Sequence, residues 1–497
     1  MNKFTKKHVR KSLLWKASEI FTGVGVNLLL KLVLAYLLEP EHFGLIGMAV
    51  VFVALVEEYA DLGFGASLIQ RKESELTPAH WNSIFWCNLL VNWAGFILIA
   101  LGLSSLATIY YGEEILEYLV IGVSVSLIWN PFIFIQRVKL NKAMEFKKLF
   151  VLQTTSVIIG GIVAMLMALN GFGVWSLVGQ GVSSSLIMLP ITFMLVSWRP
   201  KLSFDIKAVK DLFSYGAYDV LLRMVGFSHL HANILILGGL FNPIIVGHFV
   251  FAQMFTINVF KPINKIFKKV FFPLFSKIQN DRKLIKKYYL YQIQYVTAFL
   301  HPLNVGLILL APDFIGLIWG EKWIGAIYPL QYLAIFVSLI AAGGELGPIL
   351  KGIGKIEKLL YLQIIRFFVI KIPVVLFGAI LYGFEGFLLG IVLSQIVILF
   401  VNYIFIKKHI DLKGIELIKS NIGGFIGASI MGCMIYILQY IQPQMDLSLL
   451  ISLSMFGVIV YFIAYYSLGK ISSLSNWMIP INYKIFRDWV SEGPKTL

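Results

Sequence analysis

Long apolar runs, separated by short polar segments, follow one another along almost the whole chain. A window of about 20 residues, the length of a helix that spans a bilayer, finds about fourteen such runs. Their centres lie near Asn27, Ala54, Gly95, Val125, Ile159, Ser184, Val220, Phe255, Leu303, Val337, Val369, Ile391, Ile430 and Val458. Because a backbone in hydrocarbon must satisfy its own hydrogen bonds, each run predicts a membrane-spanning helix. The pattern predicts an all-α polytopic membrane protein.

Composition supports this class. Of the 497 residues, 58% are hydrophobic and 14% are charged, and the mean hydropathy is +0.82. A soluble domain is roughly half apolar. The net charge of +16 would otherwise suggest a nucleic-acid partner. A chain this apolar offers few exposed faces, so we expect no nucleic-acid binding.

The cations gather in alternate connecting segments. One set of segments holds Lys3–Lys11, Arg71 and Lys72, Arg137–Lys148, Arg199–Lys210, Lys265–Lys287, Lys351–Lys358, Lys407–Lys419 and the tail from Lys470. The other set reads EPEH, YGEE, LNGFG, FNP, PDFIGLIWGEKW, YGFEG and QPQMD, with Lys322 as its only cation. Cytoplasmic loops carry such an excess of Lys and Arg. The asymmetry predicts that both termini are cytoplasmic.

Three pairs of segments recur at a similar offset. The pairs are LLEPEHFG (37–44) with LFNPIIVG (240–247), LNKAMEFKKL (140–149) with LKGIGKIEKL (350–359), and GFGVWSLVGQ (171–180) with GFEGFLLGIVLSQ (383–395). The order predicts two parallel copies of a six-helix unit with a cavity between them. We therefore expect an N-lobe at 1–205, a C-lobe at 206–410, two additional helices at 411–470 and a cytoplasmic tail at 471–497.

Three carboxylates lie inside the second apolar run, in VEEYADLG: Glu57, Glu58 and Asp61. The first run brings Lys16 and Glu19 to a similar depth. A charge that faces lipid costs about 3 kcal/mol at mid-bilayer, so these groups should face the interior. One interpretation is an internal salt bridge with Lys16, or a wet position near the interface for Asp61. The other is a water-filled cavity in which the acids bind a proton or a sodium ion, or hold one conformation closed through Lys16.

The other charges within spans are mostly cations. Lys31 lies in the first run, Arg223 in the seventh, and Arg366 with Lys371 in the eleventh. Asp219, one turn before Arg223, could neutralise it, and the long lysine and arginine stems could snorkel to the surface. Alternatively, unpaired cations in a central cavity suit an anionic passenger, above all phosphate, which arginine grips through two hydrogen bonds. These four residues are the candidate substrate contacts.

Several chemistries are disfavoured. Cys87 and Cys433 are the only cysteines, which excludes a disulfide scaffold or a zinc cluster. The chain has no Walker A sequence, no dinucleotide fingerprint and no nucleophile elbow. We expect no resident cofactor or metal, and no ATP-driven pump working alone.

The succession DLGFGASLIQRK (61–72), QRVKLNKAMEFKKL (136–149), GFGVWSLVGQ and VFFPLFSKIQND (270–281) resembles the polysaccharide flippases of the multidrug/oligosaccharidyl-lipid/polysaccharide exporter superfamily. More narrowly, it is similar to the O-antigen and exopolysaccharide translocases known as Wzx, from Leu13 to about His409. The resemblance implies a V-shaped bundle of two lobes that alternates between cytoplasmic and periplasmic openings. The related lipid II flippases carry cavity arginines in their first two helices, where this chain has Lys16 and Lys31.

The resemblance also implies a function. The protein would flip an undecaprenyl-diphosphate-linked oligosaccharide repeat unit, for O-antigen or exopolysaccharide, across the bacterial inner membrane, driven by a proton or sodium gradient. Its partners would be that substrate and membrane lipids, with a polysaccharide polymerase and assembly proteins as further candidates. We expect no enzyme activity. Two alternatives remain: a drug or metabolite cation antiporter of the same superfamily, and a membrane polysaccharide polymerase or glycosyltransferase, which would generally need a larger extramembrane loop.

Overall fold

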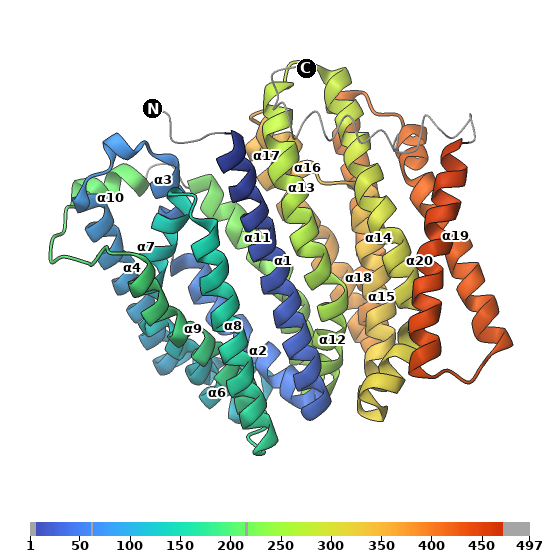
Figure 1. The fold of residues 1–497 in the computed structure, drawn as a ribbon, viewed down its shortest axis with the longest axis horizontal. Coiled ribbons are helices and arrows are strands. Elements are labelled where there is room, and N and C mark those ends of the chain that lie inside the picture. Colours follow the sequence, from blue (N-terminus) through green and yellow to red (C-terminus); the bar gives the residue numbers. More distant parts are fainter. Residues whose placement is uncertain (1–5, 61–62, 214–216, 471–497) are drawn as a thin grey trace. The chain divides into compact units, whose positions relative to one another are not determined.

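The computed structural model describes residues 6–60, 63–213 and 217–470. Every regular element in these ranges is a helix, and the predicted all-α architecture is confirmed. The tail at 471–497 and Asp61 lie outside the described residues. In Figure 1 the long helices run alongside one another within each part of the chain.

The chain forms two compact units, Met1–Phe251 and Ala252–Leu497. The helices that begin in the first unit are α1 (Lys6–Leu37), α2 (Pro40–Ala60), α3 (Phe64–Gln70), η1 (Glu73–Glu75), α4 (Pro78–Leu98), η2 (Ile99–Leu103), α5 (Ser104–Tyr111), α6 (Ile115–Ser124), η3 (Val125–Ile128), α7 (Asn130–Lys142), α8 (Phe146–Leu169), α9 (Trp175–Leu195), α10 (Ile206–Phe213), α11 (Ala217–Leu240) and α12 (Pro243–Phe255). Those of the second unit are α13 (Ile257–Lys277), α14 (Arg282–Trp319), η4 (Glu321–Ala326), α15 (Ile327–Gly343), α16 (Leu346–Gly352), α17 (Ile356–Ile364), η5 (Ile365–Lys371), α18 (Ile372–Ile410), α19 (Gly414–Ile441) and α20 (Leu447–Lys470). The lobe boundaries inferred from the repeats stay a prediction.

The predicted spans coincide with apolar helices. Ten helical segments of the described chain are long and apolar enough to cross a membrane, and the bent pair Ile115–Ile128 and Asn130–Lys142 makes eleven. Two shorter apolar helices, Thr22–Leu37 and Met224–Leu240, correspond to the first and seventh predicted spans. The segment Ile356–Ile410 holds two predicted spans.

A reversal inside α18 separates these two spans. Tyr382 and Gly383 have non-helical backbone angles, and Gly383 has φ +62°. The helices on either side pack at backbone distance, because a Cβ on Gly378 would meet the carbonyl oxygen of Gly386 and a Cβ on Gly390 would meet that of Val374. Small residues allow such close approach of helices in membranes. The segment is a helical hairpin.

The first pair of repeated segments meets in space within the first unit. α2 and α12 each begin at the proline of the repeat, Pro40 and Pro243. A Cβ on Gly44 would overlap the carbonyl oxygen of Pro243, and a Cβ on Gly247 would overlap that of Pro40. The two helix starts therefore cross in a reciprocal arrangement that relates one repeat to the other.

The other two pairs have matching turns. Glu145 N donates to Leu140 O at 2.9 Å after Met144 at φ +56°, and Lys355 N donates to Leu350 O at 2.7 Å after Gly354 at φ +73°. Gly171 and Gly383, at the third pair, have φ +79° and +62°. Equivalent left-handed residues end equivalent helices, which supports the internal repeat.

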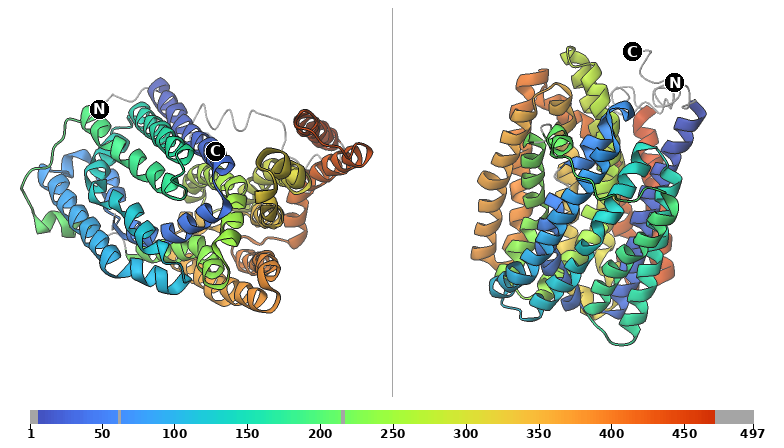
Figure 2. Two further views of the ribbon diagram at one scale, coloured as in Figure 1. Left: turned by 90° about the horizontal axis from the view of Figure 1, so that it is seen from below. Right: turned by 90° about the vertical axis from the view of Figure 1, so that its left-hand side faces the viewer.

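Helix packing in each unit leaves apolar side chains on the outside. In the first unit α8 packs along both α1 and α9, and in the second α14 packs along α15 and α19. Figure 2, left, views many of these helices end-on. Large apolar side chains such as Leu101, Ile109 and Met194 are about four-fifths exposed, at 80%, 79% and 83%. Such outward faces suit a hydrocarbon solvent rather than water.

Candidate functional site

The predicted acids of the first unit lie at the end of α2. Glu57 is accessible although protein surrounds most of its carboxylate, and Glu58 is half-buried. Glu57 therefore has an exposed side chain whose carboxyl end is recessed among protein atoms. Asp61 lies outside the described residues.

Two buried asparagines of α4 hold this end of α2. Asn88 Nδ2 donates to Ala60 O at 2.8 Å, and Asn92 Nδ2 donates to Asn88 O at 2.8 Å. One turn further along α4, a Cβ on Gly95 would overlap the side chain of Val56. The asparagine bonds satisfy a carbonyl at a helix end that would otherwise lack a partner. They fix the turn that carries Glu57 and Glu58.

The charges of α1 and α11 are more widely spread. Glu19 is half-buried and interacts electrostatically with Arg137 of α7. Lys31 is half-buried as a residue, its ammonium is surrounded by protein, and within the described residues it has no ion-pair or hydrogen-bond partner. Lys16 lies in α1 and Arg223 in α11, with side chains outside the described set. Arg137, which the sequence reasoning treated only as a loop cation, is thus the group near Glu19.

Two of the family-like segments, 61–72 and 136–149, bind each other through Lys142. Its Nζ donates to the carbonyl oxygens of Leu68 at 2.7 Å and Arg71 at 2.5 Å. These carbonyls lie at the C-terminal end of α3, where a cation is favourable. Lys139, on the same helix as Lys142, places its Nζ 3.8 Å from the centre of the Trp81 ring. Lys139 and Lys142 therefore stabilise the fold of the first unit.

Arg366 and Lys371 of the second unit lie together on η5, a π-helical segment inside the eleventh predicted span. Widened turns of this kind are rare and are frequent at functional sites. Lys371 is buried, with 6% exposure, and Arg366 is half-buried. The sequence placed both residues in this span, and the structure gives them a π-helical backbone.

A break in the tenth span lies beside η5. α15 ends at Gly343, Gly344 has φ +63°, and α16 begins after Glu345. Tyr289 of α14, which is 1% exposed, donates its hydroxyl to Gly343 O at 2.6 Å. A Cβ on Gly344 would lie 2.8 Å from the Tyr289 ring. Only glycine fits this position, because both the backbone angle and the space demand it.

The break presents Glu345 to α13 and η5. Its Oε1 accepts from Asn264 Nδ2 at 2.5 Å and pairs with Lys268 Nζ at 3.3 Å. Asn264 and Lys268 are four residues apart and so share a face of α13. Arg366 interacts electrostatically with both Glu345 and Tyr289. We call Asn264, Lys268, Tyr289, Glu345 and Arg366 the Glu345 cluster.

The guanidinium of Arg366 has unused hydrogen-bonding capacity. Its Nε and Nη2 atoms are buried and have no hydrogen-bond partner among the described residues. Buried donors of a charged group are costly to leave unpaired. A planar guanidinium with free donors is suited to an oxyanion such as phosphate, which can accept two parallel hydrogen bonds.

Sequence reasoning missed Glu345, Asn264, Lys268 and Tyr289. The double glycine Gly343-Gly344, followed directly by an acid, is the signal in the sequence that could have identified Glu345. No acid lies between Arg366 and Lys371 in the eleventh predicted span. The structure supplies one from the preceding span.

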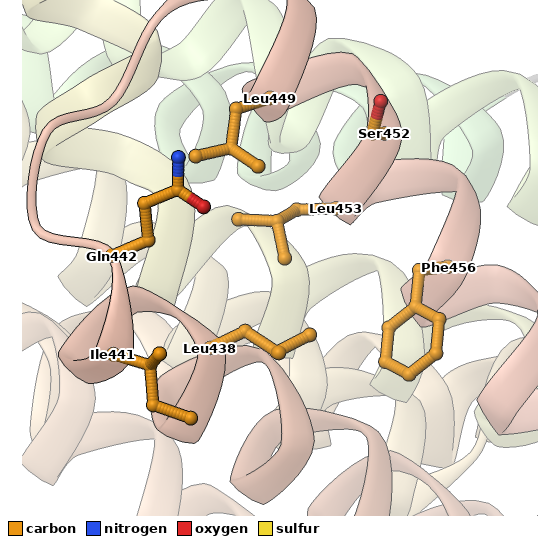
Figure 3. A pocket seen from close by; sticks show the side chains of 7 residues that line it. All are labelled: Leu438, Ile441, Gln442, Leu449, Ser452, Leu453 and Phe456. Atoms are coloured by element: carbon orange, nitrogen blue, oxygen red, sulfur yellow. The ribbon is translucent and has the colours of Figure 1, made fainter.

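One pocket of the described residues lies among apolar side chains. It has a volume of about 230 Å³ between the end of α19 and the start of α20, and its lining residues are Leu438, Ile441, Gln442, Leu449, Ser452, Leu453 and Phe456 (Figure 3). The lining is apolar apart from one amide and one hydroxyl, and offers nothing for an anion. Within the described residues, no group of three or more His, Cys, Asp or Glu side chains could hold a metal ion.

Comparison with known proteins identifies related chains. The family model described as "Polysaccharide biosynthesis protein" matches residues 33–328. The lipopolysaccharide biosynthesis protein WzxC of Escherichia coli is 24% identical over 402 residues, which cover 80% of each chain. The succinoglycan biosynthesis transport protein ExoT of Rhizobium meliloti is 26% identical over 383 residues, or 76% of this chain and 74% of ExoT.

A solved structure shares the fold. The lipid II flippase MurJ, in an inward closed conformation, superimposes with a TM-score of 0.68 at 14% identity, covering 92% of this chain and 99% of MurJ. Such coverage extends the likeness beyond the region that the family model matches.

Proposed function

This chain belongs to the polysaccharide biosynthesis protein family, and from that membership we propose that it flips an undecaprenyl-diphosphate-linked oligosaccharide repeat unit across the bacterial inner membrane by alternating access. The names of its relatives WzxC and ExoT, for lipopolysaccharide and succinoglycan, support a glycan passenger for a surface polysaccharide. The activity is transport, in which no covalent bond of the substrate changes.

The observation that carries the proposal is the guanidinium of Arg366. It lies within an apolar span, on irregular backbone, and two of its nitrogens are buried without a partner among the described residues. A diphosphate is the part of the passenger that hydrocarbon excludes most strongly. A buried cation with free donors supplies the charge and the hydrogen bonds that the diphosphate loses on leaving water.

The other candidate residues complete a mechanism. Lys31, Arg223 and Lys371 would join Arg366 in contacting the diphosphate, while the lipid tail stays in the bilayer. Glu57, Glu58 and Asp61, with Glu19 and Lys16, would bind the coupling proton or sodium ion or gate one conformation. An ion shifts the equilibrium between two states only if it binds one of them more tightly. No resident cofactor is needed.

Orientation follows from the distribution of cations. The ends of the helices that carry Lys351, Lys355 and Lys358 would face the cytoplasm, together with both termini. Arg366 lies about 12 Å further along the helix from Lys358, at a rise of about 1.5 Å per residue. The diphosphate would therefore be met in the cytoplasmic half of the membrane, where the lipid-linked unit is made. A polymerase and assembly proteins would act on it after release.

Depletion of the protein in its own host tests the proposal. We expect complete lipid-linked repeat units to accumulate on the cytoplasmic leaflet and surface polysaccharide to disappear. Complete but unpolymerised units on the outer leaflet would instead indicate a polymerase. Incomplete units would indicate a glycosyltransferase.

A cation antiporter of the same superfamily is the second alternative to be tested. Unchanged surface polysaccharide together with a gain of drug sensitivity on depletion would favour it. The buried Arg366 is unfavourable for a cationic passenger, because like charges repel most strongly where water is scarce.

A further inference from the structure

Glu345 is the acid whose charge acts on Arg366. Its carboxylate is held by the Asn264 amide at 2.5 Å and by the Lys268 ammonium at 3.3 Å, and it interacts electrostatically with Arg366. A carboxylate and a phosphate present the same oxygen acceptors to such donors. The Glu345 cluster therefore already contains the chemistry of an anion-binding site, with a protein carboxylate in it.

The pairing with Arg366 is incomplete. A strong arginine–carboxylate salt bridge is often bidentate, with two parallel short hydrogen bonds. Here Nε and Nη2 of Arg366 have no hydrogen-bond partner within the described chain, so Glu345 supplies charge but leaves those donors free. A diphosphate could add the hydrogen bonds that Glu345 does not make.

Glu345 is also partly exposed and stands outside a regular helix. Its side chain is 26% exposed and that of Lys268 is 47% exposed, so water has access to the pair. The residue stands at the break between α15 and α16, directly after Gly344 at φ +63°. Rotation at such a break would move the carboxylate without breaking the hydrogen bonds of a regular helix.

We propose that Glu345 is a displaceable counter-anion, which neutralises the cations of its cluster in the empty protein and is displaced when the passenger's diphosphate binds Arg366. This inference rests on the proposed function and assigns a positioning role to a residue outside the predicted site. Displacement of the carboxylate frees Lys268 and Asn264 as well. The contact of α13 with Glu345, at the break in the tenth span, is then lost. Binding of the diphosphate would thus be coupled to a local conformational change in the second unit.

Diphosphate binding to the purified full-length protein tests the inference. Inorganic diphosphate and farnesyl diphosphate are the probes, measured by calorimetry in nanodiscs of neutral lipid. Glu345→Gln removes the competing charge and keeps an acceptor for Asn264, so we expect about 3- to 10-fold tighter binding of both probes. Glu345→Asp keeps the charge and should bind like the wild type, and Glu345→Ala is a second neutral variant that should also bind more tightly.

Glu357→Gln is the matched control, because it removes one exposed acid of α17 at the same end of the unit without touching the cluster. Unchanged or weaker binding in both neutral Glu345 variants, with binding lost in Arg366→Ala, would overturn the inference and leave the proposed function intact. Wild-type binding in Arg366→Ala would also overturn the inference, because the diphosphate would then be held elsewhere, while the proposed function would still be decided by the depletion experiment. A purely structural role for Glu345 predicts weaker binding, never tighter.

Discussion

Gly44 and Gly247 each pack against the start of the other's helix. A Cβ on Gly44 would overlap the backbone carbonyl of Pro243, and a Cβ on Gly247 would overlap that of Pro40. Both residues stand at the same place in the first pair of repeated segments, so the contact is reciprocal. The crossing of α2 and α12 depends on backbone contact that only glycine permits.

Replacing either glycine at this crossing should destabilise the first unit to a similar extent. We expect Gly44→Ala and Gly247→Ala each to lower the free energy of unfolding by about 1 to 3 kcal/mol, because the added methyl group forces the helices apart. Thermal unfolding of the purified protein in detergent measures the effect. Gly181→Ala is the control, since a Cβ there meets nothing within 4 Å. Wild-type unfolding of both variants would show that the helices do not cross as described.

Removal of the Arg366 side chain should abolish export without loss of protein. A hydrogen bond to a charged group contributes about 1.5 to 3 kcal/mol, so Arg366→Ala should reduce diphosphate affinity at least about 10-fold. Arg366→Lys should recover only part of the activity, because an ammonium cannot make the bidentate contact. Surface polysaccharide and membrane protein levels are measured together. Lys358→Ala, at an exposed lysine of α17, is the control. Full export by Arg366→Ala would remove the residue from the substrate site.

Neutralisation of Glu57 should alter the dependence of export on the ion gradient. The carboxylate is recessed and accessible, so an ion can reach it. In Glu57→Gln we expect a weaker response of export to imposed proton or sodium gradients, measured in vesicles with a labelled lipid-linked substrate. Glu75→Gln changes an exposed acid in the η1 segment and should behave like the wild type. An unchanged response across both gradients would exclude a coupling role for Glu57.

The C-terminal helix pair should detach when the contact of α19 with α14 is disturbed. A Cβ on Gly424 would lie 3.0 Å from the carbonyl oxygen of Thr297. Gly424→Leu should therefore lower the free energy of unfolding by about 1 to 3 kcal/mol through overpacking. Cys433→Leu adds a similar side chain on an exposed face of the same helix and is the control. Equal melting temperatures for the two variants would contradict the packing of α19 on α14.

The site was only partly predictable. Arg366 and Lys371 were identifiable because charges inside apolar spans are rare and are expected to have a function. Glu345 was not identifiable in this way, because a charged residue near the end of a span can equally be exposed to water and need no function. Asn264 and Lys268 lie near the predicted end of a span rich in lysines, where no single cation stands out.

The sequence by itself determined which segments form long apolar helices suited to span a membrane, and their order along the chain, while the two-lobe repeat stays a prediction. These features follow from local composition, because every spanning helix must be apolar and must satisfy its own backbone hydrogen bonds. Tertiary structure alone decided that Glu345 meets Lys268 and Arg366, that Lys142 caps α3, and that Gly44 meets Gly247. Residues that are far apart along the chain come into contact only through the rotation and depth of packed helices, which depend on side-chain shape rather than on hydrophobicity.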